Sequence, residues 1–337
     1  FKAKKGQKFN VRVHARSVSS ALDPVLGIRD AKGKSLKGND DANNGPDSLI
    51  TFTFPADGEY FVYVYDHLRK GGPQHVYRIE TEAFNPEVVA SIPYLRQRDS
   101  QSRQMIPVPR GNRVASIMNV TRRNFSGELE FLANNLPPGI VMHAPKVPAN
   151  LTQVPIVFEA ADNAPLTKSL VDLRVLHTGA NGKKIEGGFR QNLDLVYGPP
   201  NNRTYYVSTL DRLAVAATKK VPFSIKLLKP ETPIIQSGSM SLKVVAVRDA
   251  NFTAAINVRL LTRPPGIGAS SSINIAAGKT EANYPITANG GAGIGTWQIA
   301  MLAAAKTSHG EVLTSSELVD LVIEPPYLKV KINMSAI

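Results

Sequence analysis

The chain has 337 residues, of which 42% are hydrophobic and 20% are charged, and its formal net charge is +13. This composition is typical of globular domains and excludes wholesale disorder. The absence of cysteine excludes disulfides, thiol nucleophiles and cysteine-ligated metal centres, and the apolar run at 299–305 is far shorter than the roughly 20 residues of a transmembrane helix.

Alternating apolar and polar residues dominate the first part of the chain. The runs at 8–17, 48–54, 59–66 and 75–84 are rich in valine, isoleucine, tyrosine, phenylalanine and threonine, and turn-forming residues bound each run. This period-two pattern predicts half-buried strands, and it recurs downstream about every 8 to 12 residues. The predicted fold class is all-β, with three tandem antiparallel β-sandwich domains, because the length is about two to three times that of one domain.

The segment "GNDDANNGPDS" at 38–48 connects two of these predicted strands. Calcium prefers about six to eight oxygen ligands in a flexible arrangement, which such a loop can supply. Aspartate and asparagine also favour turns through local hydrogen bonds, so a plain polar turn is the alternative. The candidate ligands for Ca²⁺ are the aspartates of this loop and of two neighbouring strand ends: Asp40, Asp41, Asp47, Asp23 and Asp66.

The stretch "YFVYVY" at 60–65 carries aromatic residues on both faces of one predicted strand. Strand alternation places Tyr60 with the valines on one face, whereas Phe61, Tyr63 and Tyr65 share the other. One face is expected to lie in the core. The outward face is either a binding surface or a set of cross-strand contacts that stabilise the sheet.

An arginine-rich segment at 96–123 contains seven arginines and a single acid, Asp99. Such a segment attracts acidic polymers through electrostatics and counterion release, although a solvated strand edge has the same composition. The candidate polyanion-binding residues are Arg96, Arg98, Arg103, Arg110, Arg113, Arg122 and Arg123.

The second half of the chain contains an internal repeat. "NFSGELEFLANNLPPGI" at 124–140 aligns with "NFTAAINVRLLTRPPGI" at 251–267, and both the Asn-Phe and the Pro-Pro-Gly-Ile anchors are displaced by 127 positions. Further on, "NLDLVYGPP" at 192–200 matches "LVDLVIEPP" at 318–326. We therefore expect two copies of one strand-rich domain, each closed by a strand that ends at a Pro-Pro pair.

The motifs of common catalytic sites do not occur in this sequence. Neither a His-Glu-x-x-His pair nor a Gly-x-Ser-x-Gly elbow is present, and "GGAGIG" at 290–295 lacks the Lys-Ser/Thr pair of a phosphate-binding loop. We therefore expect a non-catalytic chain with no bound cofactor other than calcium. The first residue is Phe1 rather than methionine, which indicates a processed or cut chain.

Residues 1–84 resemble the bacterial pre-peptidase C-terminal domain, the family that includes the collagen-binding modules of clostridial collagenases. The resemblance rests on "FKAKKGQKFNVRVHA", "LDPVLGIRDAKGKSL", "NDD", "DSLITFTFPADGEYFVYVYD" and "VYRIE", in that order. It implies a jelly-roll-like sandwich, and some members of the family bind calcium. The two repeats resemble the Ig-like or fibronectin-like domains that follow such modules in large exported bacterial proteins, especially those of planctomycetes.

Together these observations predict five segments, which are a pre-peptidase C-terminal-like sandwich at 1–84, a linker at 85–104, an Ig-like repeat at 105–200, a linker at 201–218 and a second Ig-like repeat at 219–337. The expected function is a binding, adhesion or spacer region of a larger exported protein. The expected partners are an extracellular polysaccharide or a protein ligand, with no membrane span, and nucleic acid is not favoured. Two alternatives stay open, a module that binds acidic polysaccharide and an accessory region of a secreted protease or hydrolase.

Overall fold

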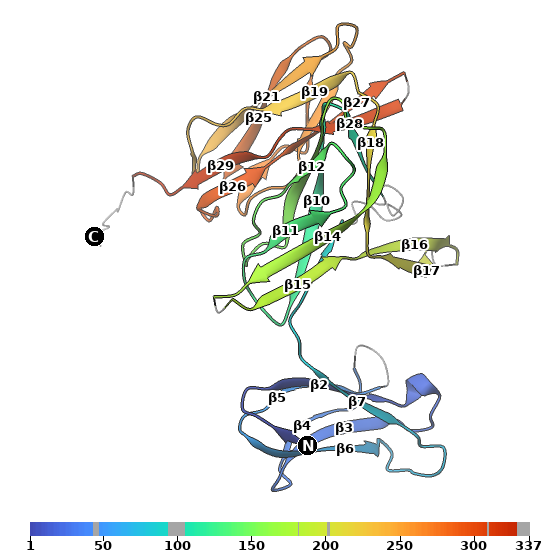
Figure 1. Ribbon diagram of the computed structural model, residues 1–337. Coiled ribbons are helices and arrows are strands. Elements are labelled where there is room, and N and C mark those ends of the chain that lie inside the picture. The colour runs from blue at the N-terminus through green and yellow to red at the C-terminus, as the bar shows by residue number, and fades with distance from the viewer. Residues whose placement is uncertain (43–46, 94–104, 181, 201–202, 309, 329–337) are drawn as a thin grey trace, which may run out of the picture. The chain divides into compact units, whose positions relative to one another are not determined.

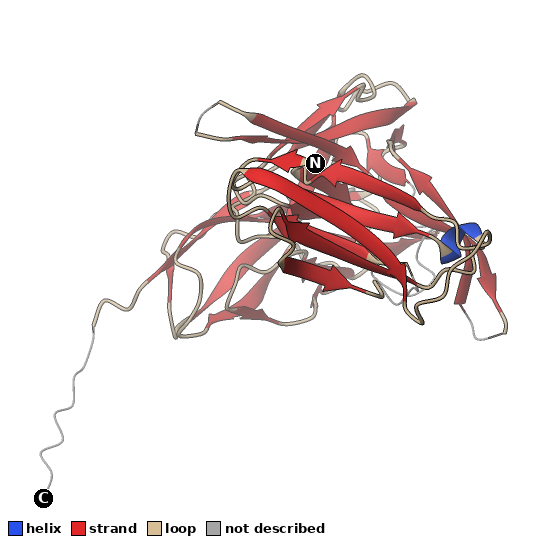
Figure 2. Cartoon of the chain, turned by 90° about the horizontal axis from the view of Figure 1, so that it is seen from below, coloured by secondary structure: helices blue, strands red, loops and turns tan. Residues whose placement is uncertain are grey.

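The computed structural model describes residues 1–42, 47–93, 105–180, 182–200, 203–308 and 310–328. The chain divides into two compact units, Phe1–Pro86 and Glu87–Ile337. Apart from one short 3-10 turn, the described residues form strands and loops (Figure 2). None of their helical structure is long and apolar enough to cross a membrane. The all-β prediction is confirmed.

Two antiparallel sheets form the first unit. The bounds of its elements are β1 Lys2–Ala3, β2 Lys8–His14, η1 Arg16–Val18, β3 Pro24–Asp30, β4 Ser35–Asn39, β5 Leu49–Thr53, β6 Gly58–Asp66 and β7 Arg78–Ala83. One sheet has the order β1-β6-β3-β4 and the other β5-β2-β7 (Figure 1). Buried side chains from both sheets, including Val11, Leu26, Ile50 and Tyr60, pack around Phe54 and form the core of a β-sandwich.

The first repeat occupies the N-terminal half of the second unit. Its strands are β8 Glu87–Ser91, β9 Met105–Pro109, β10 Arg113–Arg123, β11 Glu130–Asn134, β12 Ile140–His143, β13 Gln153–Ala160, β14 Lys168–Thr178, β15 Lys184–Phe189, β16 Gln191–Gly198, β17 Arg203–Leu210 and β18 Leu213–Thr218. Nine of these strands form one continuous sheet that encloses a single apolar core. The other two, β16 and β17, pair only with each other as a hairpin among the described strands (Figure 1).

The second repeat completes the unit and has its own core. Its strands are β19 Phe223–Leu227, β20 Ile234–Ile235, β21 Ser239–Arg248, β22 Ile256–Leu260, β23 Ile267–Ala269, β24 Ile273–Ile275, β25 Glu281–Ala288, β26 Gly295–Ile299, β27 Met301–Thr307, β28 Gly310–Ser315 and β29 Val319–Glu324. They form three sheets, β19-β21-β25-β23, β24-β22-β27-β28 and β20-β29-β26.

The two repeats share one topology. The set β8-β10-β13-β12 corresponds to β19-β21-β25-β23, and in both sets every neighbouring pair is antiparallel. The long strand β14 serves two sheets, pairing with β18 near its start and with β11 and β15 near its end. In the second repeat β26 and β27 divide these roles, since β26 pairs with β29 and β27 with β22 and β28. The prediction of two copies of one strand-rich domain is confirmed, except for the closing strand of the first copy.

The predicted anchors of the repeat lie at equivalent places. Phe125 and Phe252 are both partly buried against the core of their own repeat. In each Pro-Pro-Gly corner the glycine has a φ near +78°, with +77° for Gly139 and +79° for Gly266. A Cβ on either glycine would lie within 3 Å of an alanine, Ala164 in one repeat and Ala292 in the other. The left-handed backbone and the close approach both require glycine at this position.

The match between 192–200 and 318–326 does not mark equivalent strands. Strand β29 pairs with β20 in parallel and with β26 in antiparallel orientation. The strand with these pairings in the first repeat is β18, which lies beside β9 in parallel and beside β14 in antiparallel orientation. The hairpin β16–β17 is thus an insertion before the closing strand. Similar apolar strands followed by Pro-Pro are therefore not diagnostic of position.

The predicted linkers contain strands of the first repeat. Within 85–104, β8 pairs with β10, and within 201–218, β18 closes the fold. By its pairing pattern the first repeat thus extends from Glu87 to Thr218, wider than the predicted range of 105–200. One glycine permits part of this difference: a Cβ on Gly187 would lie 1.7 Å from the carbonyl oxygen of Val88, so β8 can pair with β15 only beside glycine.

Asn112 joins the two repeats through a buried polar contact. Its side-chain amide donates a hydrogen bond to the Phe223 carbonyl (2.8 Å), and its side-chain oxygen accepts one from the Thr314 hydroxyl. Asn112 is 6% exposed and Thr314 is fully buried. Beside them, Ala115 and Val157 pack against Ala300. Buried polar groups must be paired, so these bonds favour one docking geometry over others.

Replacing Asn112 with alanine should destabilise the second unit by about 1 to 3 kcal/mol, because the Phe223 carbonyl and the Thr314 hydroxyl lose a buried partner. The measurement is urea unfolding of the full chain. The matched control is Asn150→Ala at an exposed loop position, which should change the stability by less than about 0.5 kcal/mol. Equal stabilities of the two variants would contradict the role of Asn112.

Candidate functional site

The carboxylate of Asp47 binds backbone amides. It accepts hydrogen bonds from the N–H groups of Ala15 (3.1 Å), Arg16 (2.8 Å) and Ser17 (3.0 Å), at the start of the η1 turn. Partial burial acts to raise the pKa of Asp47, but the hydrogen bonds from Ser17, Ala15 and Arg16 outweigh it and hold the pKa below its ordinary value. Asp47 therefore serves as a cap for this turn.

Asp66 has a similar role at the end of β6. Its side chain accepts hydrogen bonds from the backbone N–H groups of Asp23 (3.0 Å), Leu68 (3.0 Å) and Lys70 (3.1 Å). The amides of Asp23 and Lys70 lower the pKa of Asp66. Asp66 thus fixes the turn that follows the strand, and it brings the backbone of Asp23 next to its own carboxylate.

Asp40 and Asp41 lie at the exposed start of the 38–48 loop, which also contains Asp47. The Asp40 carboxylate lies 3.9 Å from Nδ1 of His67, and the Asn39 side chain donates to the Asp41 carbonyl (2.7 Å). Residues 43–46 of the loop lie outside the described residues. Across the described ranges the structure groups no three His, Asp or Glu side chains as a metal site. Calcium at Asp40, Asp41, Asp47, Asp23 and Asp66 stays a prediction.

Asp47→Ala distinguishes a calcium ligand from a cap. As a cap, Asp47 should contribute about 1 to 2 kcal/mol with and without calcium, because its loss leaves backbone N–H groups unpaired. Thermal unfolding of the full chain in EDTA and in ~1 mM calcium measures this. Because the folded-state pKa is depressed, the contribution is present above about pH 4 and is lost as the pH falls through the lower folded value.

In the same experiment Asp41→Ala is the comparison, because the Asp41 side chain lies in the exposed part of the loop. A calcium site requires that calcium raise the melting temperature of the parent and that Asp41→Ala abolish the increase. Identical melting curves of the parent in calcium and in EDTA would leave the aspartates as turn-forming residues only.

The arginine-rich segment is divided between internal and exposed roles. Arg96, Arg98 and Arg103 lie outside the described residues. The guanidinium of Arg110 donates to the Ala164 carbonyl, and Arg113 pairs with Glu159 at 2.6 Å. Arg123 is exposed and lies 3.3 Å from Glu87.

Arg122 has a structural role that the sequence did not indicate. Its guanidinium donates to four backbone carbonyls, those of Gly127, Val147, Pro148 and Leu151, at 2.6 to 3.0 Å. In the second repeat the guanidinium of Arg248 binds the carbonyls of Ala254, Ala276 and Lys279. Burial lowers the pKa of both arginines. Each arginine connects the end of the long strand to neighbouring loops, so Arg122 is occupied within the fold.

A row of stacked side chains covers the outer face of β6 and β3. The rings of Tyr63 and Tyr65 are parallel within 5°, with centroids 6.2 Å apart. The guanidinium of Arg29 lies 4.0 Å from the Tyr63 centroid, and that of Arg69 lies 3.6 Å from the Tyr65 centroid. We call these four residues the tyrosine–arginine row. A Cβ on Gly27 would overlap the Tyr63 ring, so glycine lets this ring lie flat on β3.

The two faces of β6 agree with the predicted alternation. Tyr60 is in the core, and Val62 and Val64 pack against it, whereas Phe61 is 49% exposed. The arginines of the row were missed, because Arg29 and Arg69 approach the tyrosines from β3 and from the turn after β6. A hydrogen bond with Ser35 and the nearby charge of Arg29 lower the pKa of Tyr63.

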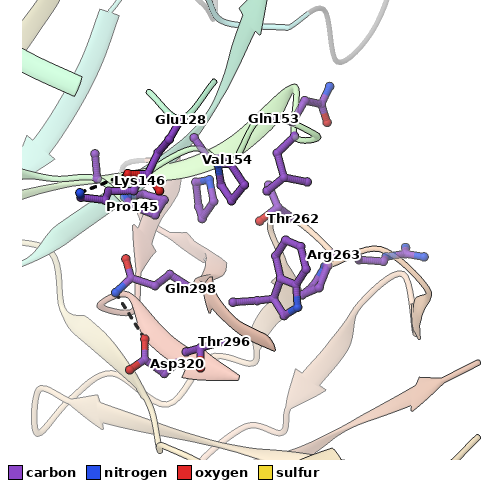
Figure 3. Close-up of a pocket in the computed structure, with 16 residues that line it drawn as sticks. Glu128, Pro145, Lys146, Gln153, Val154, Thr262, Arg263, Thr296, Gln298 and Asp320 are labelled. Atoms are coloured by element: carbon purple, nitrogen blue, oxygen red, sulfur yellow. Dashed lines mark hydrogen bonds and ion pairs between the residues drawn. The ribbon is translucent and has the colours of Figure 1, made fainter. Parts of the chain in front are cut away.

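A cleft of about 520 Å³ lies between the two repeats. The loop between β12 and β13 forms one wall, and β26, β29 and the 262–264 segment form the other. Figure 3 shows Gln298 and Asp320 on the side opposite Glu128 and Lys146. The chain's single tryptophan, Trp297, also lines the cleft. This cleft was not predicted from the sequence, although the single tryptophan is a feature that could have indicated it.

Residues 1–66 match the bacterial pre-peptidase C-terminal domain family. The two β-sandwich repeats follow this segment in the chain. A probable subtilase-type serine protease from Deinococcus radiodurans is 52% identical over 65 residues. That match covers 19% of this chain and 9% of the protease, so the chain spans a small part of this relative.

Solved structures with similar folds have low identities. The CbhA fibronectin(III)-like modules of Clostridium thermocellum are 12% identical with a TM-score of 0.21, covering 68% of this chain and 94% of that one. Domains 4–9 of the surface layer protein SbsC are 14% identical with a TM-score of 0.27, covering 93% of this chain and 40% of that one. These similarities concern the fold alone.

Proposed function

We propose that the chain is a non-catalytic binding region of a larger exported bacterial protein, in which the tyrosine–arginine row of the first unit contacts an extracellular polymer. The row is the observation that carries this proposal. It presents two aromatic rings and two guanidinium groups on one strand face, and both guanidinium groups are held over the rings. Stacking on the rings restricts the two guanidinium groups, so that their N–H groups are held in place for a ligand.

The parallel arrangement of the rings supports a linear ligand. Tyr63 and Tyr65 alternate with Val64 along β6, so their rings lie along the strand direction. Cation–π contacts orient Arg29 and Arg69 before any ligand arrives, which reduces the entropy lost on binding. A surface of this kind fits repeating units of a fibrous protein or polysaccharide.

The match of residues 1–66 to the pre-peptidase C-terminal family supports export and a place at the cell surface, in the periplasm or outside the cell. The identity to a subtilase-type protease supports a second interpretation, in which the chain is an accessory region of a secreted protease or hydrolase. In that case another part of the protein carries out catalysis, and the first unit holds the enzyme close to its polymer.

The full chain should sediment with at least one insoluble polymer from a panel of fibrillar collagen, cellulose and chitin. The Tyr63→Ala/Tyr65→Ala double variant should bind at least about tenfold more weakly, because the two rings that hold Arg29 and Arg69 in place are lost. The control is Tyr205→Ala/Tyr206→Ala, which removes two exposed tyrosines of the β16–β17 hairpin. Equal binding by the parent and the double variant, or no sedimentation with any polymer, would refute the proposal.

The acidic-polysaccharide alternative is supported by the composition of the arginine-rich segment. Four of its seven arginines contact groups of the fold, so the test addresses the other three. Replacing Arg96, Arg98 and Arg103 with serine should lower the salt concentration at which the chain elutes from heparin, because phosphate- or sulfate-like contacts depend steeply on salt. The control replaces three exposed cations of the second repeat with serine, namely Lys226, Lys229 and Arg259. It therefore has the same net charge as the test variant. Equal elution of the two triple variants would attribute retention to net charge alone.

A further inference from the structure

Trp297 is held rigidly at the wall of the cleft between the repeats. Its indole N–H donates to the Gly293 carbonyl (2.7 Å), and its ring packs against the core of the second repeat. A Cβ on Gly293 would lie 2.8 Å from the ring, so glycine at this position lets the ring sit where it does. The indole is half-buried and its remaining surface lines the cleft.

The polar side chains of the cleft are amides and balanced charges. Gln298 and Asp320 lie opposite each other on β26 and β29 and are joined by a 3.4 Å hydrogen bond, and Gln153 lies on the other repeat. The ionic lining consists of two acids and two bases: Glu128, Asp320, Lys146 and Arg263. The Lys146 ammonium lies 3.2 Å from Glu128.

This balance differs from the chain as a whole, which has a net charge of +13. A cleft whose formal charges cancel has no local excess of positive charge that would hold a polyanion inside it. It offers an aromatic surface together with amide and carboxylate groups that can donate to and accept from hydroxyl groups. This combination fits a ligand with many hydroxyls, apolar C–H faces and no charge.

We propose that the cleft binds a neutral oligosaccharide chain, with a sugar ring stacked on Trp297 and hydroxyl groups bonded to Gln298, Asp320 and Gln153. The volume of about 520 Å³ lies within the range of about 300 to 1,000 Å³ that is usual for small-ligand sites. The 3.4 Å bond between Gln298 and Asp320 is long, so a sugar hydroxyl can replace it at little cost. The site does not depend on the tyrosine–arginine row.

The cleft is formed before binding because both of its walls are constrained. Pro145, Pro148 and Pro155 restrict the backbone of the wall from the first repeat, and Pro264 begins the Pro-Pro-Gly corner in the other wall. The buried contacts of Asn112 and Ala300 hold the repeats together. A preformed site loses little entropy when a ligand enters.

Because Trp297 is the single tryptophan, its fluorescence reports on this cleft alone. The full chain is titrated with cellohexaose, chitohexaose and mannohexaose, and with decaproline and a heparin hexasaccharide for comparison. At least one neutral hexasaccharide should change the emission in a saturable manner. Gln298→Ala should weaken that binding by about tenfold through the loss of a hydrogen bond, whereas Gln74→Ala, at an exposed site in the first unit, should bind as the parent does.

Affinity electrophoresis in a gel that contains the matching polysaccharide tests Trp297→Ala, which has no fluorophore. This variant should lose retardation, and the Tyr63→Ala/Tyr65→Ala variant should keep it. No emission change with any neutral sugar, or equal retardation of Trp297→Ala and the parent, overturns the proposal. A response to decaproline alone would identify a peptide site, and a response to the heparin fragment alone a polyanion site; either result overturns it as well.

Discussion

The arrangement of the second unit depends on the buried contact of Asn112. This side chain lies in the first repeat, and its partners, the Phe223 carbonyl and the Thr314 hydroxyl, lie in the second. An apolar contact alone tolerates sliding, whereas a buried amide loses its partners if the repeats shift. The two walls of the Trp297 cleft are therefore held at one separation.

Charged side chains in this protein often satisfy backbone groups of the fold. Asp47 and Asp66 accept hydrogen bonds from turn amides, and Arg122 and Arg248 donate to loop carbonyls. Loops in small β-domains leave many backbone groups outside the sheets, and a multidentate side chain can bind several of them at once. An acidic loop or an arginine-rich segment is consequently weak evidence for a ligand, unless the structure shows which of its charged side chains do not bond to backbone groups.

Local patterns predicted the elements and the repeat well. Alternation separated Tyr60 from Phe61, Tyr63 and Tyr65, and the structure shows that the Tyr60 face is the core. The Pro-Pro-Gly anchors marked equivalent corners with left-handed glycines. They failed for β16, which has the apolar pattern of a closing strand but pairs only with β17 among the described strands. Strand partners are separated by long stretches of chain, so composition cannot indicate whether a strand joins a sheet or forms a separate hairpin.

The sequence by itself determined the β class, the similarity of residues 1–66 to a known family and the internal repeat, because these follow from period-two alternation and from motifs whose spacing is read along one chain. Only the tertiary structure decided which side chains meet. Arg29 and Tyr63 lie on neighbouring strands, and Trp297 and Gln153 come from different repeats. Such contacts arise from strand pairing and domain docking, in which residues distant in sequence are brought together by burial and backbone hydrogen bonding.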